Sequence, residues 1–102
     1  MKYEIINRIE VLDSGELLLG LEGQGDLGYQ HVYRAAAGVY WDSLLNGFKS
    51  TRVKGWSCVQ WVEQIVSTLE AELGVGVVLS EVVNWSGVPE TEIALLQKKY
   101  AK

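Results

Sequence analysis

The sequence has only one cysteine and one histidine in 102 residues, so it is poor in the residues that form disulfides and bind metal ions. It also has only one proline. A single cysteine, Cys58, excludes a disulfide within the chain. His31 and Cys58 offer no recognisable metal-ligand spacing, so we expect no metal and no cofactor. The N-terminus alternates charged and apolar residues, unlike a signal peptide, and the longest apolar runs, such as Val75–Leu79, are too short to span a membrane. These absences favour a bacterial cytoplasmic protein with no membrane partner.

Basic residues are also scarce. Nine Lys and Arg residues face 13 Asp and Glu residues, which gives a formal net charge of −4. A nucleic-acid binder normally needs a basic face that displaces counterions from phosphates. We therefore expect no nucleic-acid partner.

Aromatic residues, in contrast, are plentiful. Four Trp and five Tyr residues are a high load for a chain that is 48% hydrophobic and 22% charged, a composition typical of globular proteins. Large aromatic side chains dominate both cores and binding surfaces. At 102 residues the chain has room for one core, so we expect a single domain over residues 1–102.

The clearest pattern lies in residues 56–74, WSCVQWVEQIVSTLEAELG. Apolar residues recur there at helical spacing and predict one long amphipathic helix. Ser57 and Gln60 form a capping box, and Trp56 and Trp61 occupy the two positions that a hydrophobic staple joins. Gly74 is placed for a left-handed C-cap. Such a helix needs a large apolar partner, and we expect a β-sheet made by the first half of the chain.

The first 28 residues predict a hairpin. Residues 2–12 alternate, which places Tyr3, Ile5, Ile9 and Val11 on one face, and a turn at residues 13–16 leads to a second strand, Leu17–Glu22. Residues 23–28, GQGDLG, match the GxGxxG pattern of dinucleotide-binding loops. The residues that follow, 29–34, are β-prone and no suitably spaced acidic residue appears, so we interpret this segment as a hairpin loop.

The rest of the chain completes the fold prediction. Residues 29–37 suit a short helix, but a two-strand interpretation of Tyr29–Asp42 fits the neighbouring segments better. A turn at 43–47 and a strand at 48–51 follow, and then one or two strands at 75–85, for which Gly76 and the Ser80–Glu81 pair are the two candidate breaks. A helix with Pro89 at its first position ends the chain. The predicted class is α+β. It has two layers, a mostly antiparallel sheet of four to six strands covered by one long amphipathic helix, and a C-terminal helix.

An aromatic site is predicted on the sheet. In an alternating strand, Tyr29, His31 and Tyr33 project to one face. Tyr40 or Trp41 from the neighbouring strand, with Asp42 to orient the histidine, would complete a pocket for a ligand or partner. The candidate binding residues are therefore Tyr29, His31, Tyr33, Tyr40, Trp41 and Asp42. We assign no catalytic residue, interpret Cys58 as structural, and leave open whether Trp41 and Trp85 are core or interface.

Four segments resemble small orphan proteins encoded by bacterial integron gene cassettes. They are GYQHVYRAAAGVYWD, GFKS, WSCVQWVEQI and VVNWSGVP, which together extend over residues 28–89. The resemblance implies an α+β fold, self-association and a biochemical role that is uncharacterised in these proteins. It brings no functional residues with it.

Three functions are compatible with these observations. The leading hypothesis is a non-enzymatic binding or interaction protein that forms a homo-oligomer and has a small-molecule or protein partner. An immunity-type inhibitor that masks a basic toxin is the second, because the chain is small and acidic. The third is a small enzyme, which requires His31, Asp42 and a tyrosine to converge in one cleft.

Overall fold

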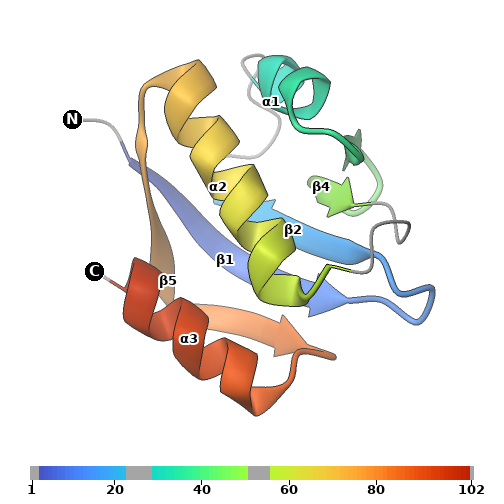
Figure 1. Ribbon diagram of the computed structural model, residues 1–102, viewed down its shortest axis with the longest axis vertical. Helices are drawn as coiled ribbons and strands as arrows, with labels where there is room; N and C mark the ends of the chain where they lie inside the picture. Colours follow the sequence, from blue (N-terminus) through green and yellow to red (C-terminus); the bar gives the residue numbers. More distant parts are fainter. Residues whose placement is uncertain (1–2, 23–28, 51–55, 102) are drawn as a thin grey trace.

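The computed structural model describes residues 3–22, 29–50 and 56–101. Five strands form one sheet in the order β3-β4-β2-β1-β5, and the helices lie on one face of it (Figure 1). The β1–β5 pair is parallel and the other pairs are antiparallel. The predicted α+β class, with a sheet, a long helix and a C-terminal helix, is confirmed. The elements are β1 (Tyr3–Val11), β2 (Leu17–Leu21), α1 (Tyr29–Ala35), β3 (Val39–Asp42), β4 (Gly47–Ser50), α2 (Cys58–Leu73), β5 (Gly76–Ser86) and α3 (Glu90–Tyr100).

Helix α2 has the ends that its sequence predicts. The Ser57 hydroxyl accepts a hydrogen bond from the Gln60 backbone N–H (3.2 Å), and the Gln60 side chain accepts one from the Ser57 N–H (2.8 Å). The Trp56 and Trp61 rings lie 4.8 Å apart between centroids. Gly74 adopts φ 64° and ends the helix. Local capping therefore sets the length and the entry angle of this helix.

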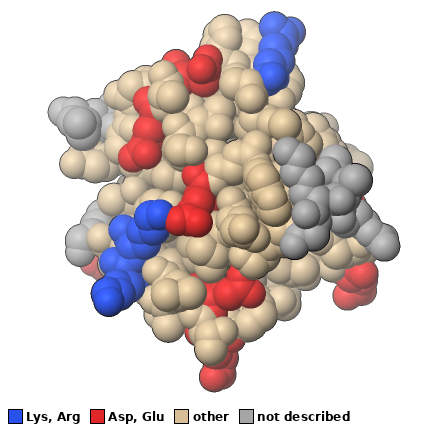
Figure 2. Space-filling view, in the orientation of Figure 1, with Lys and Arg blue, Asp and Glu red and all other residues tan. Residues whose placement is uncertain are grey.

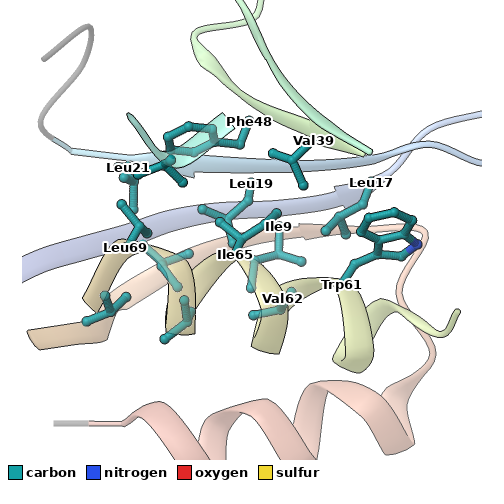
Figure 3. Close-up of a cluster of buried hydrophobic side chains, with 14 of the residues drawn as sticks. Ile9, Leu17, Leu19, Leu21, Val39, Phe48, Trp61, Val62, Ile65 and Leu69 are labelled. Carbon is teal, nitrogen blue, oxygen red and sulfur yellow. The ribbon is translucent and has the colours of Figure 1, made fainter. Parts of the chain in front are cut away.

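The core lies between α2 and the sheet (Figure 3). Val62, Ile65 and Leu69 point from α2 toward the strands and are fully buried. Leu17, Leu19 and Leu21 meet them from β2, as the alternation of that strand predicts. Burial of large aliphatic side chains on both sides is the main stabilising term for this fold.

The predicted single face of the first strand is wrong in one respect. Ile6 and Ile9 are both fully buried in the core, whereas Tyr3 is 54% exposed. The pairing register of β1 shifts between Ile6 and Arg8, so one extra residue interrupts the alternation. Consequently Tyr3 and Ile5 face away from the helices, while Ile9 and Val11 face toward them.

The two-strand interpretation of Tyr29–Asp42 is also wrong in its first half, because Tyr29–Ala35 is helix α1. Tyr29, Val32 and Ala36 are buried, a spacing of three and four residues that only a helix places on one face. Gly38, with φ 79°, then turns the chain into β3. The predicted strand–turn–strand that follows is confirmed as β3 and β4. The GxGxxG segment, residues 23–28, lies outside the described residues.

The last third of the chain agrees with its prediction except at one residue. Strand β5 is continuous from Gly76 to Ser86, but its pairing with β1 is interrupted between Leu79 and Asn84, at the second of the two candidate breaks. Pro89 is the N-cap of α3, with ψ 143°, and not the first helical residue. Leu96 is the residue of α3 that is fully buried against the core. No described helix is long and apolar enough to cross a membrane.

Candidate functional site

The structure divides the predicted aromatic site between the core and the surface. Tyr29 and Trp41 pack with Phe48 in an aromatic cluster, in which the ring centroids are 5.1–5.3 Å apart. The Tyr29 hydroxyl donates a hydrogen bond to the buried carboxylate of Glu4 (2.9 Å). These rings contribute to the core, and Trp41 and Trp85 are both half-buried against it.

The other predicted residues lie in two further places. His31 is exposed on α1, and Tyr33 is half-buried against the core on the same helix. Tyr40 and Asp42 alternate with Trp41 along β3, so they project from the opposite side of the sheet. The single predicted pocket does not form because α1 is a helix. His31 and Asp42 are thus separated by the sheet and do not converge as the enzyme hypothesis requires.

Tyr40 and Asp42 belong to a sheet face that no described helix covers. We call it the uncovered face. The strand register brings Glu10, Leu18, Lys49 and Tyr40 side by side across four strands. The residues of the uncovered face are Tyr3, Ile5, Arg8, Glu10, Leu18, Tyr40, Asp42, Lys49, Val78 and Asn84.

A polar network occupies one end of this face. The Tyr40 hydroxyl donates a hydrogen bond to Glu16 (2.5 Å). The Lys49 ammonium lies 3.5 Å from carboxylate oxygens of both Glu16 and Asp42, and 5.7 Å from the centroid of the Tyr40 ring. Two carboxylates, one ammonium and one phenol therefore hold each other in place.

The turn between β3 and β4 is fastened to the same face. The Asp42 carboxylate accepts hydrogen bonds from the backbone N–H groups of Leu44 (2.9 Å) and Leu45 (3.0 Å). The Arg8 guanidinium donates a hydrogen bond to the Leu45 carbonyl oxygen. Leu44 is left 95% exposed at the tip. An ordered turn thus presents an apolar side chain to solvent.

The network shifts the pKa values of its members. The hydrogen bond from Tyr40, with a second one from Ser14, lowers the pKa of Glu16, and the same bond to Glu16 raises the pKa of Tyr40. The backbone N–H groups of Leu45 and Leu44 lower the pKa of Asp42. Desolvation opposes the charge of Lys49, but Tyr40 and Glu16 outweigh it and raise the Lys49 pKa. The network therefore keeps its charges at neutral pH.

We expect Tyr40→Phe to raise the pKa of Glu16 toward the ordinary value of 4.5, because the strongest hydrogen bond to the carboxylate is lost. In the native protein the Glu16 pKa is depressed. Its stabilising contribution is therefore present above pH 4.5 and is lost as the pH falls through the folded-state value. Carbon-detected NMR titration of the Glu16 carboxyl measures the change. Tyr33→Phe, on the helix side, is the matched control, and equal Glu16 titrations in the two variants would contradict the network.

The opposite end of the uncovered face is apolar. Tyr3, Ile5 and Val78, together with Ala101, line a shallow hollow of about 540 Å³. The Tyr3 ring lies over Gly76, where an added Cβ would be 2.6 Å from the ring. Glycine at this position allows the close approach of the ring to the backbone of β5.

The described residues hold no group of three or more His, Cys, Asp or Glu side chains that could bind a metal ion. Cys58 is buried at the start of α2, and burial together with the nearby Glu92 raises its thiol pKa to about 12. A thiol with this pKa is protonated at neutral pH and is a poor nucleophile. The structural interpretation of Cys58 is consistent with this environment.

Sequence patterns did not identify the partners of Tyr40 and Asp42. Glu16 lies in the first hairpin and Lys49 in β4, and only the β2–β4 and β3–β4 pairings bring them together. The alternation of Val39–Asp42 does place Tyr40 and Asp42 on one face. The one available signal for their partners was Lys49, a charged residue in the next predicted strand.

Comparisons with known proteins identify relatives of the chain. A family profile for Integron Cassette Protein Hfx_Cass5 matches residues 24–83. A solved structure of Integron Cassette Protein Hfx_Cass5, from the mobile metagenome of North West Arm Sewage Outfall, is 30% identical. The similarity covers 96% of this chain and 95% of that chain, with a TM-score of 0.41. A search of curated proteins finds no match. The family match over more than half of the chain shows that this chain belongs to the Hfx_Cass5 family of integron cassette proteins.

Proposed function

We propose that this protein is a non-enzymatic interaction domain of the bacterial cytoplasm, and that it self-associates through the uncovered face. The observation that supports the proposal is the combination of an unshielded sheet face with exposed apolar side chains on it and on the adjoining β3–β4 turn. Tyr3, Tyr40 and Leu44 are 54%, 38% and 95% exposed, and the last of these projects from an ordered turn. Exposed apolar groups gathered on one face mark interaction surfaces.

The size and chemistry of the uncovered face suit a second copy of the chain. The molecule measures 30 × 29 × 22 Å, so a broad face of it is comparable with the roughly 800 Å² that each partner buries in a standard interface. The face carries an apolar end and a charged end that contains both signs. In a dimer with a two-fold axis, the same face of both copies forms the interface, so the apolar end and the charged end of one copy would each contact a fixed part of the same face on the other copy.

Light scattering coupled to size-exclusion chromatography tests this proposal. We expect the wild-type protein to have the mass of a dimer at high micromolar concentration. Leu44→Asp should weaken the dimer at least about ten-fold, because the new carboxylate would be buried in the interface. Leu44 is 95% exposed in one subunit, so the substitution leaves the subunit fold intact.

Leu95→Asp is the matched control, since Leu95 is 58% exposed on α3, which lies on the helix side. It should leave the mass unchanged. A wild-type monomer at high micromolar concentration, or equal dissociation by both variants, would contradict self-association through the uncovered face.

The distribution of charge supports a second candidate function, that of an immunity-type inhibitor. Figure 2 shows acidic side chains at several places on the helix-covered face, while Lys and Arg are confined to fewer places. An acidic surface of this kind would complement a basic toxin. A neighbouring reading frame whose growth inhibition this chain relieves would support the idea, and a cassette without such a frame would count against it.

A further inference from the structure

A second surface feature lies between β5 and the last turns of α3, and it borders the apolar hollow of the uncovered face, with which it shares Ala101. It is a groove of about 390 Å³, within the usual size range of small-ligand sites. From β5 it is lined by Leu79, Ser80, Glu81, Val83 and Trp85, and from α3 by Gln97. The proposed self-association does not use these residues.

The groove owes its shape to the interruption of β5. Between Leu79 and Asn84 the strand leaves its pairing with β1, where only Asn7 lies between the paired residues Ile6 and Arg8. The Ser80 hydroxyl accepts a hydrogen bond from the Val82 backbone N–H (3.2 Å), which orders this bend. Such an interruption changes the direction in which the side chains of the strand point. Because the bend is hydrogen-bonded locally, it is a fixed feature of the structure. Here it brings the Glu81 carboxylate to a groove with an aromatic wall.

The lining of the groove combines apolar side chains with the polar side chains of Ser80 and Gln97, and it carries one charge. Leu79 is buried, Val83 and Trp85 are half-buried, and Glu81 is exposed and is the one ionisable residue among those that line the groove. An aromatic ring and a carboxylate both attract cations, and the aromatic ring favours those that are weakly hydrated. Anionic ligands are disfavoured at such a surface.

The end of helix α3 adds to this preference. Ala101, the C-cap, also lines the groove and donates its N–H to the Gln97 carbonyl oxygen (3.1 Å). The last carbonyl groups of a helix carry the negative end of its dipole, which favours a nearby cation. Of the two lysines in this last turn, Lys99 forms an ion pair with Glu63 of α2, and neither lines the groove.

We propose that this groove binds a small quaternary ammonium compound. The cationic head contacts Trp85 and Glu81 beside the end of α3, and its methyl groups contact Leu79 and Val83. A quaternary head gains from apolar contact with Leu79 and Val83 in addition to its attraction to the aromatic ring and the carboxylate.

Calorimetric and NMR titrations with choline and its uncharged isostere 3,3-dimethylbutan-1-ol test the proposal on the full chain. The two probes have almost the same shape and differ in charge. We expect choline to bind and to shift the Trp85 indole N–H resonance, while the isostere binds at least about ten-fold more weakly. Equal binding of the two probes, or no binding of choline, would overturn the proposal.

Glu81→Gln keeps the shape of the side chain and removes the charge. It should weaken choline binding about five-fold or more, whereas Glu90→Gln, an exposed acidic residue at the other end of α3, should have no effect. Because both positions are exposed, neither variant is expected to unfold. Equal choline affinities of Glu81→Gln and the wild-type protein would show that the Glu81 carboxylate takes no part in binding, which contradicts the proposed recognition.

Discussion

Phe48→Ala is expected to lower the free energy of unfolding by about 3–5 kcal/mol, the usual range for a fully buried phenylalanine. The Phe48 side chain is 0% exposed. Its ring lies 5.2 Å from the Tyr29 ring and 5.1 Å from the Trp41 ring between centroids, so both neighbours would border the new cavity. Urea unfolding followed by far-ultraviolet circular dichroism measures the loss.

Tyr40→Ala is the control for the other face of the sheet. Tyr40 comes from the strand that pairs with β4 and is 38% exposed. We expect it to cost roughly 1 kcal/mol, the scale of its hydrogen bond and its partly exposed ring. Equal losses in Tyr40→Ala and Phe48→Ala would contradict the assignment of one aromatic set to the core and the other to the surface.

Gly87→Ala is expected to destabilise the fold by about 2–4 kcal/mol, because two unfavourable terms combine at this residue. Gly87 adopts φ 70°, a region that costs other residues energy. A Cβ there would also lie 2.5 Å from the Val11 carbonyl oxygen at the end of β1, a contact that the backbone must shift to relieve. Thermal and urea unfolding of the variant give the change in free energy.

Gly74→Ala separates the two terms. Gly74 has a similar φ of 64°, but an added Cβ would meet nothing within 4 Å. Its cost should be that of the backbone conformation alone, about 1–2 kcal/mol. If Gly87→Ala lowered the free energy of unfolding no more than Gly74→Ala does, the close contact between the β5–α3 connection and β1 would be contradicted.

Features written in local sequence were predictable. Ser57, Gln60 and Gly74 determine both ends of α2 through contacts within five residues of each cap. The alternation of Leu17, Leu19 and Leu21 likewise identified the buried face of β2. In both cases the structure that the local pattern favours is also the one that tertiary packing stabilises, so the local pattern was a sufficient guide.

Features decided by distant contacts were not predictable. Helix α1 has only seven residues, too few to be stable alone, and it forms because Tyr29 and Val32 are buried against other elements. The register shift after Ile6 changes which face Tyr3 occupies, and no local pattern marks it. As a result, the predicted site grouped Tyr40 and Asp42 with Tyr29, which lies in the core.

Concentration-dependent NMR of the wild-type protein tests most directly the central claim, self-association through the uncovered face. Backbone amide spectra recorded over a dilution series should show shifts concentrated at residues such as Tyr3, Arg8 and Leu44, which lie on or beside that face. Amides of the exposed side of α2, such as those of Ser67 and Glu70, should remain unchanged. Spectra that do not change with concentration, or shifts concentrated on the helices, would contradict the proposed function.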